Sequence, residues 1–128
     1  MRFMLIAVGV ALLTVFLVSG HSLFRFNPAL ADAPALRFTL RGHHIYILLM
    51  GLFILVLGAY FQPHELPRVR YLQIFAATLL VASALLVAAT FFAQDAAVDH
   101  RPVTNRALKV FAFASLLLAA AAPRRRFA

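Results

Sequence analysis

Four long apolar runs, separated by shorter polar segments, form the main pattern of this chain. A helix needs about 20 apolar residues to cross a hydrocarbon layer of roughly 30 Å, and about 17–25 are tolerated. Because a backbone in lipid must satisfy its own hydrogen bonds, runs of this length are expected to be helical. The pattern therefore predicts four transmembrane helices, at residues 3–20, 43–61, 71–93 and 105–122.

The first and the fourth runs need a further argument. A charged start, an apolar stretch and the small residues Ser19 and Gly20 also fit a secretory signal peptide. The chain retains this segment from Met1 onward, so we expect a transmembrane helix. The fourth run contains Lys109, whose long side chain can reach the headgroup layer from near the end of a helix. We therefore expect this run to span the membrane as well.

Prolines mark the connections between the runs and the end of the fourth run, as expected of residues that interrupt helices. They are Pro28, Pro34, Pro63, Pro67, Pro102 and Pro123. The second and third connections are short, which favours antiparallel packing of neighbouring helices. We predict one all-α integral membrane domain over residues 1–128, a four-transmembrane-helix antiparallel bundle with a longer interfacial first loop and a basic C-terminal tail at residues 123–128.

The predicted first loop, residues 21–42, mixes phenylalanines and leucines with arginines. This composition is typical of a segment that lies in the headgroup layer of a membrane. Apolar and polar residues also alternate strictly over residues 36–41, which fits a short strand against a partner protein. We favour the interfacial loop.

The composition agrees with a membrane protein and excludes several other classes. Hydrophobic residues make up 64% of the chain and charged residues 12%, whereas soluble domains have about 45–50% and about 25%. A soluble enzyme, a disordered tail and a coiled coil are therefore excluded. The chain contains no cysteine, which also excludes thiol and disulfide chemistry and cysteine-bound metals.

The net charge of +8 comes from twelve basic and four acidic side chains. In the predicted topology the basic residues divide equally between the two membrane surfaces, so the positive-inside rule gives no orientation. The basic tail directly after the fourth run favours cytoplasmic termini, and we expect a bacterial inner membrane. The basic residues that we expect to contact anionic lipid or a partner, rather than nucleic acid, are Arg37, Arg41, Arg124, Arg125 and Arg126.

Small residues recur on one face of three predicted helices, where they would let helices approach closely. These residues are Gly51 and Gly58, then Ala77, Ala84 and Ala88, then Ala112, Ser115 and Ala119. The general abundance of alanine also explains much of this pattern. Polar residues of the third run can bind a neighbouring helix or their own helical turn; they are Gln73, Thr78, Ser83 and Thr90.

Most histidines lie at the ends of runs that the predicted topology brings to one membrane surface. This set comprises His21, His43, His44 and His100, with Asp95 and Asp99 close to the last of them. Imidazole and carboxylate groups bind transition metals, and two imidazoles bind haem. Histidine is also common at membrane interfaces without any ligand. We therefore predict no cofactor and keep a haem or metal site on these residues as the alternative.

Three function classes follow from these observations. The apolar runs contain no carboxylate, the usual marker of an ion or proton path, which disfavours a small homo-oligomeric channel or carrier. The second class is a haem- or metal-binding membrane protein that uses the histidines. We favour the third, a non-catalytic accessory or assembly subunit of a larger membrane complex. Its expected partners are other membrane protein subunits and anionic lipids, with no nucleic acid and no soluble substrate.

Overall fold

The computed structural model describes residues 1–26, 34–93 and 101–123, which form four long α-helices. These are α1 (Arg2–Phe26), α2 (Pro34–Tyr60), α3 (Pro67–Phe92) and α4 (Arg101–Ala120). Each helix contains a stretch long and apolar enough to cross a membrane, at Arg2–His21, Arg37–Tyr60, Pro67–Phe92 and Pro102–Ala120. The prediction of four apolar, membrane-length helices is confirmed.

Proline begins three of these helices. Pro34 and Pro67 are the first residues of α2 and α3, and Pro102 is the second residue of α4. Proline suits these positions because its backbone angle is already helical and the amide hydrogen that it lacks would have no helical partner there. These prolines therefore define where the helices start, and do not interrupt them.

Both helices that flank the first connection are longer than the sequence predicts. Helix α1 continues to Phe26 and α2 begins at Pro34, so most of the predicted interfacial loop, residues 21–42, is helical. The alternative strand at residues 36–41 is also wrong. Six alternating residues are too few to establish a strand period, and the buried residues Leu40, His43 and Ile47 instead follow helical spacing.

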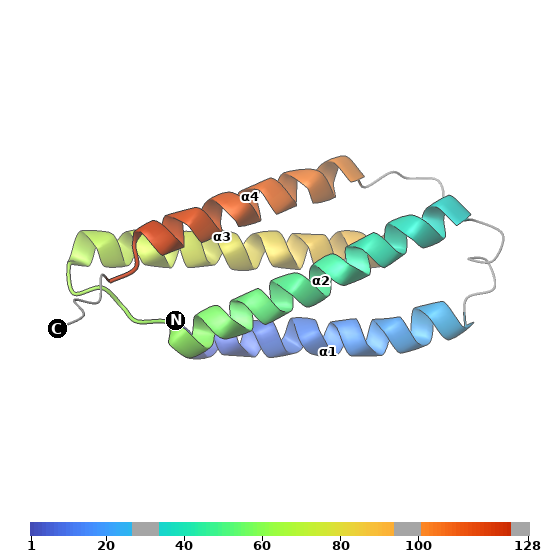
Figure 1. Cartoon of the computed structure of the whole chain (residues 1–128), viewed down its shortest axis with the longest axis horizontal. Helices are drawn as coiled ribbons and strands as arrows, with labels where there is room; N and C mark the ends of the chain where they lie inside the picture. Colours follow the sequence, from blue (N-terminus) through green and yellow to red (C-terminus); the bar gives the residue numbers. More distant parts are fainter. Residues whose placement is uncertain (27–33, 94–100, 124–128) are drawn as a thin grey trace.

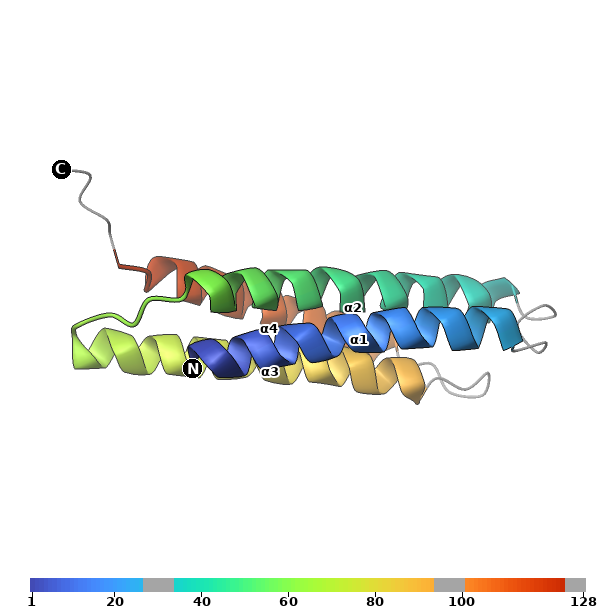
Figure 2. The same ribbon diagram turned by 90° about the horizontal axis from the view of Figure 1, so that it is seen from below.

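The helices pack as two pairs. Helix α1 lies along α2, α3 lies along α4, and α2 joins the pairs by packing on α3. Figures 1 and 2 show that the chain reverses direction between successive helices and that α1 and α2 stay side by side along most of their length. The buried apolar side chains between them include Leu5, Leu12, Ile54, Leu80 and Val87.

Glycines bring the backbones of α1 and α2 into contact. A Cβ atom on Gly9 would lie 2.7 Å from the backbone nitrogen of Leu55, and one on Gly58 would lie 2.8 Å from that of Ile6. Gly51 is buried against Leu12 of α1. Small residues permit such approach, which increases van der Waals contact between membrane helices. Of these glycines, the sequence pattern identified Gly51 and Gly58 as packing residues but not Gly9.

The two alanine-rich faces behave differently. On α3, Ala77, Ala84 and Ala88 are buried in the core. On α4, in contrast, Ala112 and Ala119 are exposed. Helix α4 turns a different face toward the core from the one that the sequence predicts. The buried residues of this face and of the turn after the helix are Thr104, Ala107, Ala114, Leu118 and Ala121. The small-residue face predicted for α4 therefore lies largely outside the core.

Large apolar side chains also cover the outer surface. Phe3, Leu17, Phe38 and Leu116 are each more than two-thirds exposed, and many other leucines and phenylalanines are partly exposed. Water-soluble monomers rarely expose apolar surface on this scale. This surface and the four membrane-length helices together indicate a membrane protein.

Candidate functional site

Two adjacent histidines at one end of α2 connect all four helices. His43 and His44 follow each other on the helix, so their side chains point about 100° apart. His43 contacts α4, and His44 contacts α1 and α3. We call these two residues the histidine pair.

His43 is only 4% exposed, and both of its ring nitrogens are engaged. Nδ1 lies 3.0 Å from the backbone oxygen of Thr39, and Nε2 lies 2.6 Å from Oγ1 of Thr104. The Thr104 oxygen lies 3.1 Å from Oγ1 of Thr90 on α3. One imidazole thereby ties α2 to α4 directly and to α3 through two hydroxyls.

The chemical groups in this series of hydrogen bonds determine where some of the hydrogens lie. The Thr39 carbonyl can only accept, so Nδ1 of His43 carries the hydrogen and donates it. In a neutral ring, Nε2 then accepts from the Thr104 hydroxyl. In a protonated ring, Nε2 donates to Thr104, Thr104 donates to Thr90, and Thr90 donates to the Val87 carbonyl at 2.9 Å. The hydroxyls can therefore accommodate either protonation state by rotating.

His44 is held between aromatic rings. Its Nε2 donates to the backbone oxygen of Phe16 on α1 at 2.7 Å. The imidazole stacks on the Phe16 ring, with centroids 4.1 Å apart, and faces the Phe91 ring of α3 at 5.9 Å. Gly20 makes room for it, because a Cβ atom there would lie 2.7 Å from Cε1 of His44. The pattern of the sequence did not identify Gly20, Phe16 or Phe91 as partners.

The candidate metal-binding residues of the alternative interpretation have different surroundings. His21 is exposed on α1, while His43 is buried and His44 partly buried. Within residues 1–26, 34–93 and 101–123, no three histidine or acidic side chains lie close enough together to hold a metal ion. His100, Asp95 and Asp99 lie outside the described residues. In the described arrangement, both nitrogens of His43 bind protein groups.

At the opposite end of the bundle, Gln73 joins three segments. Its side chain is 2% exposed, and its Oε1 accepts the backbone N–H of His64 at 2.9 Å. Its Nε2 donates to the backbone oxygens of Gln62 and Ala121, at 3.3 and 3.0 Å. This single amide connects α3 to the α2–α3 connection and to the residue that follows α4. Thr78 and Ser83 instead bond to their own helix.

The predicted basic contact residues are only partly described. Arg37 and Arg41 are exposed one turn apart near the start of α2, where anionic headgroups can reach them. Arg124, Arg125 and Arg126 lie outside the described residues.

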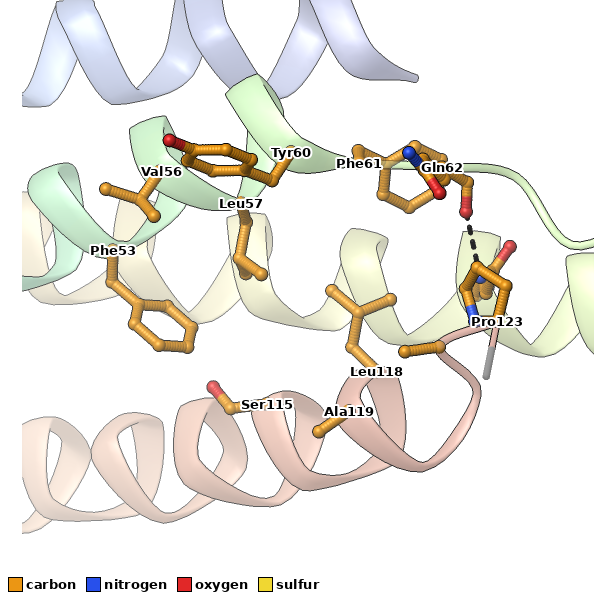
Figure 3. A pocket seen from close by; sticks show the side chains of 12 residues that line it. Phe53, Val56, Leu57, Tyr60, Phe61, Gln62, Ser115, Leu118, Ala119 and Pro123 are labelled. Carbon is orange, nitrogen blue, oxygen red and sulfur yellow. Dashed lines mark hydrogen bonds between the residues drawn. The ribbon is translucent and has the colours of Figure 1, made fainter. Parts of the chain in front are cut away.

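A groove of about 370 Å³ separates α2 from α4 at the end of the molecule where Gln73 lies. Figure 3 shows Phe53 and Leu57 of α2 directed toward α4, with Leu118 opposite them. Ser115 and Ala119 form the α4 wall with Leu118. We call this space the α2–α4 groove. Its α2 wall consists of large side chains, whereas its α4 wall combines Leu118 with the small residues Ser115 and Ala119.

The sequence predicted some of the residues that line this groove, but not the groove itself. It placed Ser115 and Ala119 on one face of the fourth helix, but the rotation of that face away from α3 depends on packing.

Comparisons of the chain with protein-family models, with curated proteins and with solved structures gave no match.

Proposed function

We propose that this protein is a non-catalytic accessory or assembly subunit of a larger membrane complex. It inserts as an antiparallel four-helix bundle, and a transmembrane helix of a partner subunit packs in the α2–α4 groove. The observation that carries the proposal is this groove, where small residues of α4 face aromatic residues of α2 across an open space.

The interior of the described bundle supports a structural role. Six polar residues are buried there: Ser19, His43, Gln73, Ser83, Thr90 and Thr104. Each makes a hydrogen bond within the chain. The bonds of His43, Thr90 and Thr104 cross between helices, and Gln73 bonds to the residue that follows α4. Buried hydrogen bonds of this kind hold helices in one arrangement, which is a structural role.

The shape of the groove favours a helix as its occupant. Membrane helices associate through close van der Waals contact at small residues, as α1 and α2 do at Gly9 and Gly58. On α4, Ser115 and Ala119 provide the same kind of surface one turn apart. The hydroxyl of Ser115 donates to the Phe111 carbonyl at 2.8 Å, so it presents no unpaired hydrogen to lipid. Phe53 and Tyr60 can then pack on the flank of the incoming helix.

Native purification of the full chain in mild detergent tests this function. We expect larger membrane subunits to copurify in fixed stoichiometry. Ala119→Phe fills the groove and should remove them, whereas Ala82→Phe, at an exposed position of α3, should retain them. A lone homo-oligomer, or partners that survive Ala119→Phe, would contradict the proposal.

We further propose a bacterial inner-membrane location with both termini in the cytoplasm. The basic tail, residues 123–128, supports this orientation through the positive-inside rule. Arg37 and Arg41 would then contact anionic headgroups on the opposite surface.

A further inference from the structure

A second cavity lies between α2 and α4, next to His43. It has a volume of about 260 Å³. Its lining includes Phe38, Gly42, His43, Tyr46, Thr104 and Asn105. The rings of Phe53 and Phe111, whose centroids are 5.5 Å apart, bridge α2 and α4 between this cavity and the α2–α4 groove. The two spaces are therefore distinct, and we call this one the histidine cavity.

Two polar side chains of the histidine cavity, those of Tyr46 and Asn105, can donate hydrogen bonds to a ligand. His43 and Thr104 already bond to each other, and they form part of the wall. Within the described part of the chain, neither the Tyr46 hydroxyl nor the Asn105 amide forms a hydrogen bond. A phenol and an amide provide O–H and N–H donors. Such donors match the carbonyl oxygens of a ligand.

The rest of the lining indicates a neutral, flat molecule. Of the residues that line the histidine cavity, none is a lysine, arginine, aspartate or glutamate. The rings of Phe38 and Tyr46 provide apolar contact surface, and Gly42 leaves open space, since a Cβ atom there would meet no atom within 4 Å. A charged phosphate group would lack a cationic partner in this lining.

The depth of the cavity indicates how a ligand would reach it. The lining residues lie in the first turns of the apolar stretches of α2 and α4, which begin at Arg37 and Pro102. Phe38 is 81% exposed and Tyr46 38% exposed, so the lining continues onto the outer surface. A ligand dissolved in the membrane can therefore enter from the side, with a polar ring near the headgroup level and an apolar tail in lipid.

We propose that the histidine cavity binds the ring of a membrane-soluble quinone. Tyr46 and Asn105 donate hydrogen bonds to its carbonyl oxygens, and the aromatic side chains contact its faces. The site is separate from the α2–α4 groove, so this proposal does not depend on the proposed docking function.

Tyrosine fluorescence can report on this site directly. The chain has three tyrosines and no tryptophan, so the double variant Tyr60→Phe, Tyr71→Phe leaves Tyr46 as the sole tyrosine. Decylubiquinone is titrated into this protein in detergent micelles. We expect saturable quenching of Tyr46. A protein with Tyr71 as its sole tyrosine should show only linear, collisional quenching, because Tyr71 lies far from the cavity and is 73% exposed.

Two variants in the Tyr46-only protein locate the bound ring. Gly42→Leu places a side chain in the open space and should weaken the saturable binding by at least about tenfold. Asn105→Leu removes one donor and should weaken it by about five- to tenfold, the usual effect of one lost hydrogen bond. Ala82→Leu adds the same side chain at an exposed position of α3 and should leave binding unchanged.

Several results would overturn the proposal. Linear quenching of Tyr46, equal to that of Tyr71, would mean that the quinone only dissolves in the micelle. Saturable quenching that survives Gly42→Leu would place the quinone elsewhere. A phospholipid that native mass spectrometry finds on the wild type, and that is lost in Gly42→Leu, would replace the quinone as the occupant.

Discussion

At the scale of single residues, the histidine pair depends on its surroundings as much as on its own chemistry. His44 fits only because Gly20 lacks a side chain, and His43 is buried only because Thr39 and Thr104 satisfy its nitrogens. The sequence indicated that histidines gather at one end of the bundle. It could not identify these partners, because they depend on the rotation of each helix and on side-chain rotamers.

The two glycines beside the histidine pair should respond oppositely to alanine. Gly42→Ala adds a Cβ in open space and should stabilise the protein by up to about 1 kcal/mol through helix propensity. Gly20→Ala gains the same propensity, but it forces His44 from its bond with Phe16. Overpacking costs about 1–3 kcal/mol, so a net loss of up to about 2 kcal/mol is expected. Thermal unfolding in detergent compares them, and equal shifts would refute the Gly20 contact.

Removal of the Thr104 hydroxyl tests the bond with His43. Thr104→Val keeps the shape of the side chain, leaves Nε2 of His43 without this partner and also removes the contact with the Thr90 hydroxyl. We expect a loss of about 0.6–1.7 kcal/mol, the range for hydrogen bonds between membrane helices. Thr14→Val, at an exposed position where the hydroxyl bonds only its own helix, is the control and should change stability by less than 0.5 kcal/mol or so. Similar losses in both variants would argue against the buried link.

At the scale of elements, the sequence predicted the helices better than their ends. The mean hydropathy of a run of some twenty residues depends little on any single residue, so each apolar run predicted its helix. The ends depend on local choices: Pro34 begins α2 where a break was expected, and α1 continues past His21. Arginine and leucine have high helix propensity, and residues of these two types at both ends favour extension of the helices beyond the apolar run.

Gln73 should govern how firmly the second connection is attached. Gln73→Leu keeps a side chain of similar size but removes the bonds to His64, Gln62 and Ala121. We expect faster amide hydrogen exchange at His64 and lower stability by about 1–3 kcal/mol, because one buried and two partly buried hydrogen bonds to the backbone are lost. Thr78→Val, whose hydroxyl bonds only within α3, is the matched control. Unchanged exchange at His64 would show that the connection is held by other contacts.

At the scale of the whole molecule, the proposed topology can be tested because the chain has no cysteine. Single variants Leu66→Cys and Ala35→Cys introduce exposed thiols at opposite ends of the bundle, and Ala35 lies just before the apolar stretch of α2 begins at Arg37. In inside-out vesicles of the inner membrane, a membrane-impermeant maleimide should label Leu66→Cys first, since cytoplasmic termini put the α2–α3 connection on the same side. In right-side-out vesicles Ala35→Cys should react first. The reverse pattern would invert the orientation, and equal labelling in sealed vesicles would contradict a spanning bundle.

The contacts of α2 also limit which changes in length the molecule can accept. Each inserted residue rotates the following helix by about 100°. One residue added between His44 and Gly51 would turn the glycine face away from α1 while the histidine pair kept its partners. Substitutions on the outer surface of α2 leave both sets of contacts in phase. The number of residues between the histidine pair and Gly58 is therefore fixed, even at outer positions of α2 where the residue type can change.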